Sequence, residues 1–234
     1  MAIEVVPGVY GISMTFVQAY LIADDGLTLV DSGLPRQGLK KITAEMERLG
    51  RKAGDLKHIV VTHYHVDHAG SLAALRQASG ATVYMHPEDA PYIRGDKPLP
   101  GPNPAGLAGR LLAPFFLRLF GRGLEASAVD REVADGEVLP IGEGLQVVHA
   151  PGHTPGHIAV LMPSKKVLFV GDALANTFGL RPPVGMFTVD MAQARESMRK
   201  LAQLEFEVAC FGHGRVLKGQ AQAAFRRFVE KLAR

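Results

Sequence analysis

The chain has 234 residues, of which 47% are hydrophobic and 21% are charged, and its formal net charge is +3. This composition is that of a globular protein with enough apolar side chains for a core, and it excludes a disordered chain. The charge is small and no block of consecutive basic residues stands out, so we expect no nucleic-acid partner.

The first part of the chain alternates strand-like and helix-like patterns. Strands bounded by turn-prone residues are predicted over 9–13, 16–23, 27–31, 58–62 and 81–86. Two helices are predicted over 35–50 and 69–80. In the first of these helices, Leu39, Ile42, Met46 and Leu49 recur on one face.

The second part repeats this alternation. Strands are predicted over 145–150 and 208–212, a hairpin over 157–172 that turns at Ser164-Lys165, and helices over 190–204 and 220–234. In each half strands come first and a helix follows. This order favours two sheets with helices outside them over a single parallel sheet.

Residues 91–127 interrupt the alternation. Residues 91–109 are rich in Pro and Gly and are predicted to form a loop. A cluster of large apolar side chains follows, interrupted by Pro114 and interspersed with arginines: Leu111, Leu112, Phe115, Phe116, Leu119 and Phe120. We expect this insertion to determine specificity by roofing a site and receiving an acyl chain. The alternative is that it packs on the core or forms a homodimer interface.

The stretch VTHYHVDHAGSL places His63, His65, Asp67 and His68 within six positions, directly after a predicted strand. Histidine nitrogens and carboxylate oxygens bind Zn²⁺ or Fe²⁺. His63 and His65 alternate in an extended segment and can hold one ion from one side, whereas Asp67 and His68 lie where the chain turns into a helix. Two adjacent ions accommodate this arrangement, provided that other segments supply further ligands.

Three later segments supply candidates, each directly after a predicted strand: PGHTPGH with His153 and His157, GD with Asp172, and GHG with His213. Strand ends converge on one rim of a sheet, so separate strands can deliver ligands to one point while glycines allow close approach of the backbone. His58, His86 and His149 fall outside this set, and we interpret them as structural.

HYHVDH, GHTPGH, GDA and GHG, in this order after an early DSG, resemble the motifs of the metallo-β-lactamase superfamily from about Val9 to Gly214. The resemblance implies one domain over 1–234 of class α+β, an αββα sandwich of two mixed sheets flanked by helices. It also implies the roles of single residues. The first metal would be bound by His63, His65 and His153, and the second by Asp67, His68 and His213; Asp172 would bridge both, and Asp31 and His157 would orient ligands.

Two divalent ions sharing a water would make hydroxide available at neutral pH, so the resemblance implies hydrolysis without a serine or cysteine nucleophile. We expect zinc, with iron or manganese as alternatives. Asp67 is expected to be catalytic as well, by orienting or shuttling a proton. Asp172 stands where β-lactam hydrolases usually carry cysteine, which favours the glyoxalase II-like or lactonase-like branch. The expected substrate is a small-molecule ester, thioester or lactone.

Three alternatives remain open. One is an oxidoreductase of the persulfide dioxygenase type, with one iron held by His63, His65 or His153 together with Asp172. Another is a phosphodiesterase, although a nuclease would need a basic RNA-binding arm. The third is a non-catalytic metal-binding protein, against which the retention of all seven ligands argues. Only about twenty residues follow Gly214, so the helical glutathione-binding domain of glyoxalase II is not expected.

Three features bear on location. The N-terminal residues lack a basic stretch followed by a long apolar one, so we expect no secretory signal. No window approaches the roughly 20 apolar residues that a membrane span needs. Cys210, the only cysteine, cannot form an intrachain disulfide, and its apolar neighbours favour a buried thiol. Our expectation is a cytoplasmic protein.

Overall fold

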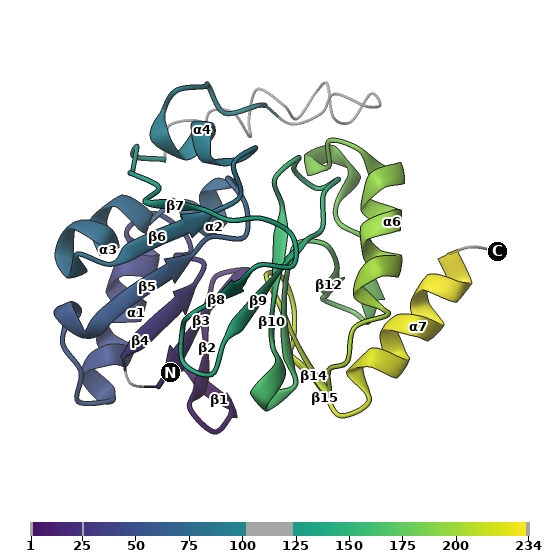
Figure 1. Cartoon of the computed structure of the whole chain (residues 1–234), viewed down its shortest axis with the longest axis horizontal. Helices are drawn as coiled ribbons and strands as arrows, with labels where there is room; N and C mark the ends of the chain where they lie inside the picture. The colour runs from purple at the N-terminus through teal and green to yellow at the C-terminus, as the bar shows by residue number, and fades with distance from the viewer. Residues whose placement is uncertain (1, 25, 102–123, 233–234) are drawn as a thin grey trace.

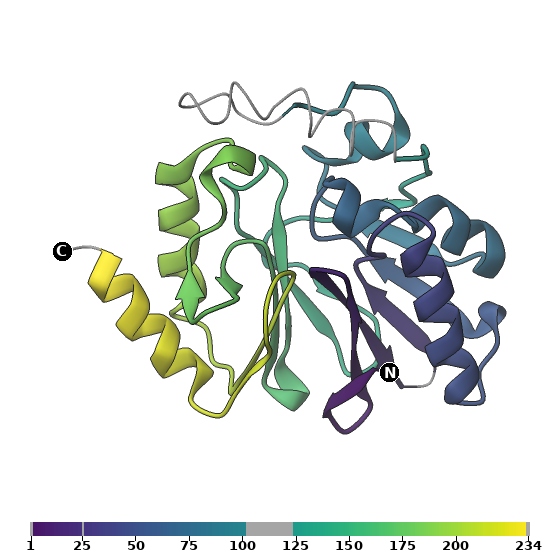
Figure 2. The ribbon, with the colours of Figure 1, turned by 180° about the vertical axis from the view of Figure 1, so that it is seen from behind.

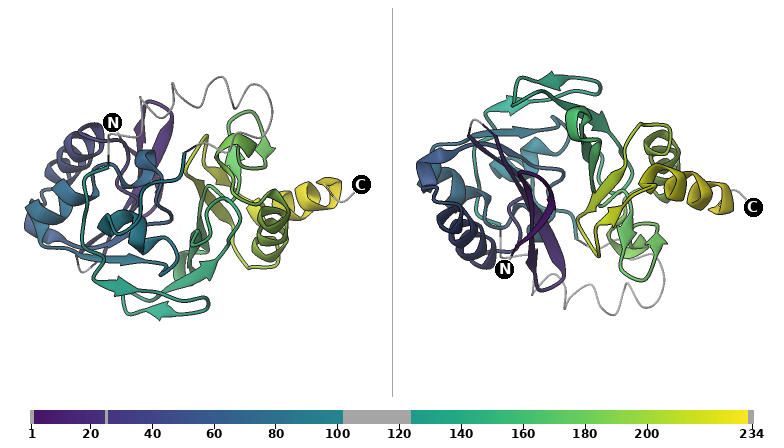
Figure 3. Two further views of the ribbon diagram at one scale, coloured as in Figure 1. Left: turned by 90° about the horizontal axis from the view of Figure 1, so that it is seen from above. Right: turned by 90° about the horizontal axis from the view of Figure 1, so that it is seen from below.

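Two mixed β-sheets pack face to face at the centre of the structure, and helices cover the outer face of each sheet (Figure 1). This computed structural model describes residues 2–24, 26–101 and 124–232. Views from above and from below show the order helix, sheet, sheet, helix (Figure 3). The expected α+β fold, an αββα sandwich, is confirmed.

The first sheet has seven strands that neighbour one another in sequence order: β1 (Ile3–Val6), β2 (Val9–Met14), β3 (Val17–Ala23), β4 (Leu27–Val30), β5 (Leu56–Val60), β6 (Thr82–Met85) and β7 (Arg131–Glu132). β1 to β4 pair antiparallel, and β4 to β7 pair parallel. Parallel neighbours need crossover connections. Helices α1 (Gln37–Arg48) and α3 (Leu72–Ser79) lie in these connections and cover the outer face.

The second sheet has six strands in the order β15 (Leu217–Lys218), β14 (Val208–Phe211), β11 (Val167–Gly171), β10 (Ile158–Met162), β9 (Leu145–His149) and β8 (Val138–Leu139). Only β11 and β14 pair parallel, and helix α6 (Met191–Leu201) lies in the crossover between them. Helix α7 (Ala221–Leu232) lies beside α6 on the outer face (Figure 2).

Shorter elements lie between the longer ones within each half. They are α2 (Val66–Ala69), α4 (Ala90–Arg94), the ribbon of β12 (Ala175–Asn176) and β13 (Leu180–Arg181), and the 3₁₀ turns η1 (Ala53–Asp55), η2 (Pro163–Lys165) and η3 (Gly185–Phe187). None of the helices in the described residues is long and apolar enough to cross a bilayer.

Successive side chains of a strand point to opposite faces of its sheet. The side chains of the central strands therefore contribute to three layers of core. In β3, Tyr20 and Ile22 point between the sheets, whereas Ala19 and Leu21 point toward α1 and α3. β10 divides its side chains in the same way between the inter-sheet core and the core under α6 and α7. Both strands are buried on both faces, which explains why they read as nearly continuous apolar runs.

The structure corrects the sequence prediction at several short elements. The pattern does not predict β1, β7, β8 and β15, which have two to four residues each.

The loop predicted at 91–109 is wrong at its start, because α4 extends over Ala90–Arg94 with Pro91 in its first turn. The helix predicted at 69–80 begins only at Leu72. Gly70 separates it from α2, and a Cβ there would lie 2.4 Å from Cδ of Pro35. The apolar cluster over 111–120 lies outside the described residues.

Helix α7 is anchored by Phe225, which is fully buried, with its ring centroid 5.1 Å from that of Phe206 and 5.9 Å from that of Phe211. We expect Phe225→Ala to lower the free energy of unfolding by about 3–5 kcal/mol, because truncation leaves a cavity. Urea denaturation measures this loss. Phe178→Ala, at a side chain that is 87% exposed, is the control and should change it by less than about 0.5 kcal/mol. Equal losses would contradict the anchoring role of Phe225.

Candidate metal centre

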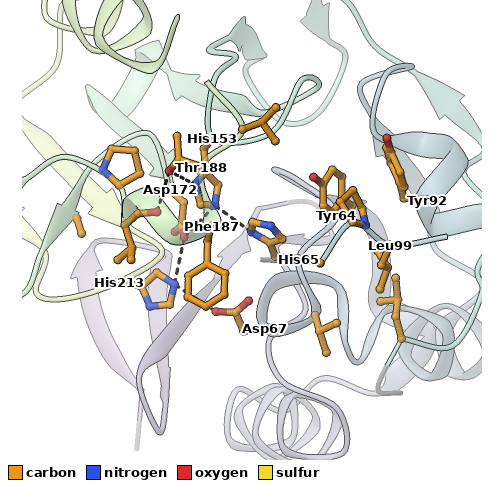
Figure 4. Close-up of a pocket in the computed structure, with 18 of the residues that line it drawn as sticks. Tyr64, His65, Asp67, Tyr92, Leu99, His153, Asp172, Phe187, Thr188 and His213 are labelled. Atoms are coloured by element: carbon orange, nitrogen blue, oxygen red, sulfur yellow. Dashed lines mark hydrogen bonds and ion pairs between the residues drawn. The ribbon is translucent and has the colours of Figure 1, made fainter. Parts of the chain in front are cut away.

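The predicted ligands lie at strand ends from both sheets, at one edge of the sandwich. His63 and His65 follow β5 of the first sheet, while His153, Asp172 and His213 follow β9, β11 and β14 of the second. Figure 4 shows His65, His153, Asp172 and His213 converging on one point beside Asp67. With His63 and His68, these side chains form three overlapping groups, in each of which the potential ligand atoms lie within 4.8 Å of one another. The structure therefore brings all seven predicted ligands together.

The first cluster consists of three imidazoles. Nδ1 of His65 lies 3.1 Å from Nε2 of His63 and 2.9 Å from Nε2 of His153. Burial lowers the pKa of His63 and His153 well below the usual value, and that of His65 to about 4. The three rings are thus neutral at pH 7, which is the form that binds a metal.

The second cluster combines two imidazoles with a carboxylate. Nε2 of His213 lies 3.2 Å from Oδ2 of Asp67 and 3.4 Å from Nε2 of His68. Burial lowers the pKa of His213, but Asp172 and Asp67 outweigh it and raise that pKa to about 10. Burial likewise raises the pKa of Asp67, but His68 and His213 bring it down to about 2. The second cluster is therefore charged at neutral pH, with an anionic Asp67 and a protonated His213, whereas the first is neutral.

Asp172 lies between the two clusters. Its Oδ1 is 3.3 Å from Nε2 of His68, and its Oδ2 is 3.5 Å from Nε2 of His153 and 3.1 Å from Nε2 of His213. Oδ1 is buried and, apart from this ion-pair contact with His68, has no hydrogen-bond partner among the described residues. A buried carboxylate oxygen without a donor is costly unless a cation compensates it. The donor set and this orphaned oxygen fit two adjacent divalent cations that share Asp172.

Asp31 lies next to one predicted ligand. Its carboxylate accepts from the backbone N–H of Thr62 at 2.8 Å, from the Thr62 hydroxyl at 2.9 Å and from Nδ1–H of His68 at 2.8 Å. These bonds leave Nε2 of His68 facing Asp172. Asp31 adopts φ +61°, a left-handed conformation that is unfavourable for a non-glycine residue. The hydrogen bonds to its three partners must offset the free-energy cost of this backbone conformation.

His157 contacts Asp172 through the backbone. Its Nε2 accepts from the backbone N–H of Asp172 at 2.9 Å, and burial lowers its pKa to about 3. Nδ1 of His157 is buried and has no partner among the described residues. His157 therefore holds the chain that carries Asp172 and does not face the clusters with a free nitrogen lone pair.

Three partners of the predicted ligands were not expected from the sequence. Nδ1 of His63 lies 3.0 Å from the Thr62 hydroxyl, Nδ1 of His153 lies 3.3 Å from the Thr188 hydroxyl, and Nδ1–H of His213 donates to the carbonyl of Phe16 at 2.8 Å. Such contacts fix which nitrogen faces a metal. Thr62 precedes a ligand and could have been found from its position. Thr188 and Phe16 lie in turns with no pattern that marks them.

Asp89 is a further residue that the sequence analysis missed. It is fully buried and accepts from the Thr154 hydroxyl at 2.6 Å, from the N–H of Gly156 at 2.7 Å and from the N–H of Tyr64 at 3.2 Å. It precedes α4 but makes no side-chain cap there, which is the usual role of Asp at that position. Asp89 instead joins the segments that carry His65 and His153. The signal that could have found it is its place just after β6.

The histidines that we interpreted as structural, and the single cysteine, lie away from the two clusters. His86 and His149 stack with centroids 4.0 Å apart and planes at 9°, and Nε2–H of His149 donates to Pro155. Glu88 lies close enough to complete a fourth group, but rings that stack in parallel planes direct their in-plane lone pairs poorly at one shared ion. His58 contacts the Tyr84 hydroxyl at 3.2 Å. Cys210 is fully buried, and burial raises its pKa.

A cavity of about 1050 Å³ opens above the clusters. His65, Asp67, His153, Asp172 and His213 form part of its wall (Figure 4). Parts of the insertion expected to determine specificity also line it, namely Tyr92, residues 95–101, Leu124 and Ala126. The clusters are thus accessible to a ligand of substantial size.

The sequence and fold both match known proteins. Residues 13–213 match the family model of the metallo-beta-lactamase superfamily. The probable metallo-hydrolase YflN of Bacillus subtilis (strain 168) is 29% identical over 235 residues, which cover 93% of this chain and 88% of that protein. A hydroxyacylglutathione hydrolase of Rhodobacter capsulatus is 34% identical over 160 residues, 68% of this chain but 48% of that protein, so the match spans about half of it.

Solved structures share the fold. A metallo-beta-lactamase family protein from Thermus thermophilus superposes with a TM-score of 0.73 at 24% identity, covering 97% of this chain and 80% of that one. The metallo-beta-lactamase SMB-1, in a complex with mercaptoacetic acid, gives 0.70 at 23% identity, covering 96% and 91%. At these identities the likeness concerns the fold alone.

The contact between Asp31 and His68 generates a prediction about metal affinity. Asp31→Asn replaces an acceptor oxygen with a donor, so that one of its three partners loses its bond. We expect zinc affinity to fall about 10- to 100-fold, as measured by competition with a chromogenic chelator. Asp130→Asn is the control, because Asp130 accepts from Arg76 and from the N–H of Val83 and belongs to neither cluster. Unchanged affinity in Asp31→Asn would contradict an orienting role.

The link through Asp89 generates a second prediction, specific to the first cluster. Thr154→Val removes the hydroxyl that donates to Asp89 and keeps the shape, whereas Thr154→Ser keeps the hydroxyl. We expect Thr154→Val to weaken one bound ion about tenfold and to leave the other, because a buried carboxylate loses a donor next to His153. Elemental analysis after dialysis against graded chelator counts the retained ions. If the two variants behave alike, Asp89 does not position this cluster.

Proposed function

The chain belongs to the metallo-beta-lactamase superfamily, and we propose that it is a dinuclear metal-dependent hydrolase that cleaves a small-molecule carboxylic ester, thioester or lactone. The observation that carries this proposal is the shared position of Asp172 between a three-histidine cluster and an Asp-His-His cluster. The similarity to a probable metallo-hydrolase over most of both chains supports it.

Each cluster would hold one ion. His63, His65 and His153 would bind the first, Asp67, His68 and His213 the second, and Asp172 both. Nitrogen and carboxylate donors in this number suit zinc, and iron or manganese accept the same set. When bound, such ions would supply an activated water at neutral pH and Lewis acidity toward the scissile carbonyl.

The chain's own groups would orient the reaction. Asp67 has the exposure needed to meet solvent, since its side chain is 20% accessible and lines the cavity. Its lowered pKa keeps it anionic at neutral pH, so it would accept a hydrogen bond from the attacking water and hold that water in line with the carbonyl. Thr62, Thr188 and the carbonyl of Phe16 would keep the proton on the remote nitrogen of His63, His153 and His213.

A protein nucleophile is not needed for this chemistry. Cys210 lies in the core between the sheets and does not line the cavity. The named activity of the Rhodobacter capsulatus relative is hydrolysis of a hydroxyacylglutathione, which supports a thioester as one candidate bond. Because the match spans about half of that relative, its glutathione specificity is not carried over to this chain.

The test combines metal content with a panel of esters, thioesters, lactones and phosphodiesters. We expect two ions per chain and cleavage of a carbonyl substrate, with kcat/KM falling at least about 10³-fold in His63→Ala, because the first ion loses a ligand. His58→Ala is the matched control, since His58 lies on β5 and contacts Tyr84 outside the clusters.

Two outcomes would contradict the proposal. One iron per chain with oxygen consumption on a persulfide would favour the dioxygenase alternative. Two ions with no cleavage of any carbonyl substrate in the panel would leave a phosphodiesterase or a metal-binding protein instead.

A further inference from the structure

The wall of the cavity above the clusters is mainly apolar. From the first half of the chain it includes Tyr64, Val66, Tyr92, Leu99 and Leu124; from the second half it includes Ala175, Pro182, Pro183, Val184, Phe187 and Val189. Figure 4 shows Tyr64, Tyr92 and Leu99 on one side of the clusters and Phe187 directly beside them. The ring centroid of Phe187 is 6.4 Å from that of His65. Apolar surface therefore extends from the clusters outward on both sides.

Half of the large exposed apolar side chains in the described part of the chain line this cavity. The large hydrophobic residues that are exposed in the described part of the chain are Ile3, Phe16, Val138, Phe178, Val184 and Val189. Three of them, Phe16, Val184 and Val189, line the cavity, with exposures of 47%, 62% and 53%. A contiguous apolar surface of this kind on a folded domain marks a ligand or partner site.

Charge in the described part of the wall lies at its exposed rim. Apart from the cluster residues Asp67, Asp172 and His213, the charged residues there are Asp96, Lys97 and Arg181, and all three are exposed. Asp96 pairs with Arg94 at 2.9 Å, and the Lys97 ammonium lies 5.8 Å from the ring centroid of Tyr92. A peptide-like group buried deeper would lose its hydration and find few partners, whereas a hydrocarbon chain needs none.

The apolar wall is fastened to a predicted ligand. The Thr188 hydroxyl donates to the carbonyl of Val184 at 2.9 Å and lies 3.3 Å from Nδ1 of His153. The backbone N–H of Val189 donates to the carbonyl of His153 at 3.1 Å. A chain held against Val184 and Val189 would therefore be positioned relative to His153.

From this placement we propose that the cavity is an acyl-chain site, and that the substrate is an ester or thioester whose acyl group is a hydrocarbon chain of about eight carbons or more. This inference rests on the proposed hydrolytic function and adds the class of acyl group to it. The volume of about 1050 Å³ is at the upper end for small-molecule sites and exceeds the need of a short hydroxyacyl group. The polar leaving group would extend past Lys97 and Arg181 into solvent.

A matched pair of substitutions tests the proposal. Val184 and Val138 are both 62% exposed, but Val184 lines the cavity and Val138 lies on β8. With the two-metal protein and p-nitrophenyl esters from acetate to decanoate, we expect kcat/KM to rise about two- to fourfold per methylene until the cavity is filled. Val184→Asp should lower kcat/KM for octanoate at least tenfold and for acetate less than threefold. Val138→Asp should change neither.

A binding measurement separates this inference from the proposed function. Calorimetry of the metal-free protein with decanoate and with acetate should show at least tenfold tighter binding of decanoate, weakened at least tenfold by Val184→Asp and not by Val138→Asp. If no ester is cleaved but decanoate binds in this way, the hydrolase proposal fails and the acyl-chain site stands. A chain-length profile that is flat or falling in an active enzyme, or equal effects of the two substitutions, would overturn the acyl-chain site.

Discussion

The arrangement of the site depends on one buried carboxylate, Asp172, which faces imidazoles of two clusters and has an oxygen with no hydrogen-bond partner among the described residues apart from its ion-pair contact with His68. Burial raises the pKa of this carboxyl group, but His213 and His68 lower it well below its usual value. The positive charge that faces the Asp172 carboxylate is distributed unevenly between the clusters. Burial lowers the pKa of His63, so this ring is neutral. Burial also opposes protonation of His68, but Asp172, Asp31 and Asp67 outweigh it and raise the pKa of that ring. Two bound cations would take over from these protons and compensate the negative charge of Asp172 on the side of both clusters.

The fold supplies this arrangement by bringing strand ends of two sheets to one edge and by allowing close backbone approach there. A Cβ on Gly212 would lie 2.3 Å from Oδ1 of Asp172 and 2.5 Å from Cε1 of His68, so only glycine fits. Gly171, at φ +56°, turns the chain from β11 into Asp172. Asp31 and Asp89 each join two segments distant in sequence. The geometry of the site is thus set by contacts between segments distant in sequence, some of them between the sheets, and not by the local sequence of one motif.

The difference between local motifs and contacts between distant segments explains what the sequence could predict. The ligand candidates were recognisable because each follows an apolar strand, and the family resemblance ordered them into two sets. The long strands and helices were predictable from periodicity, whereas β7 and β8 have two residues each and exist through pairing alone. Thr188 contacts His153 from 35 residues away in a turn, so no local pattern marks it. Asp89 reads as an ordinary helix cap, and only the structure shows that its side chain points to Tyr64 and Thr154.

The proposed acyl-chain site and the proposed metal centre would be connected through the turn that carries Val184, Thr188 and Val189. The hydroxyl of Thr188 contacts both the wall, at the carbonyl of Val184, and the predicted ligand His153. A substrate that displaces this turn would disturb Nδ1 of His153, while one that fits against it would leave the ligand geometry intact. In the proposed hydrolysis, binding of this kind would favour the acyl group that matches the wall at the step where the carbonyl is attacked, and not only in the initial complex. In the proposed enzyme, the apolar wall would therefore contribute to selection through the position of His153 as well as through burial of hydrocarbon.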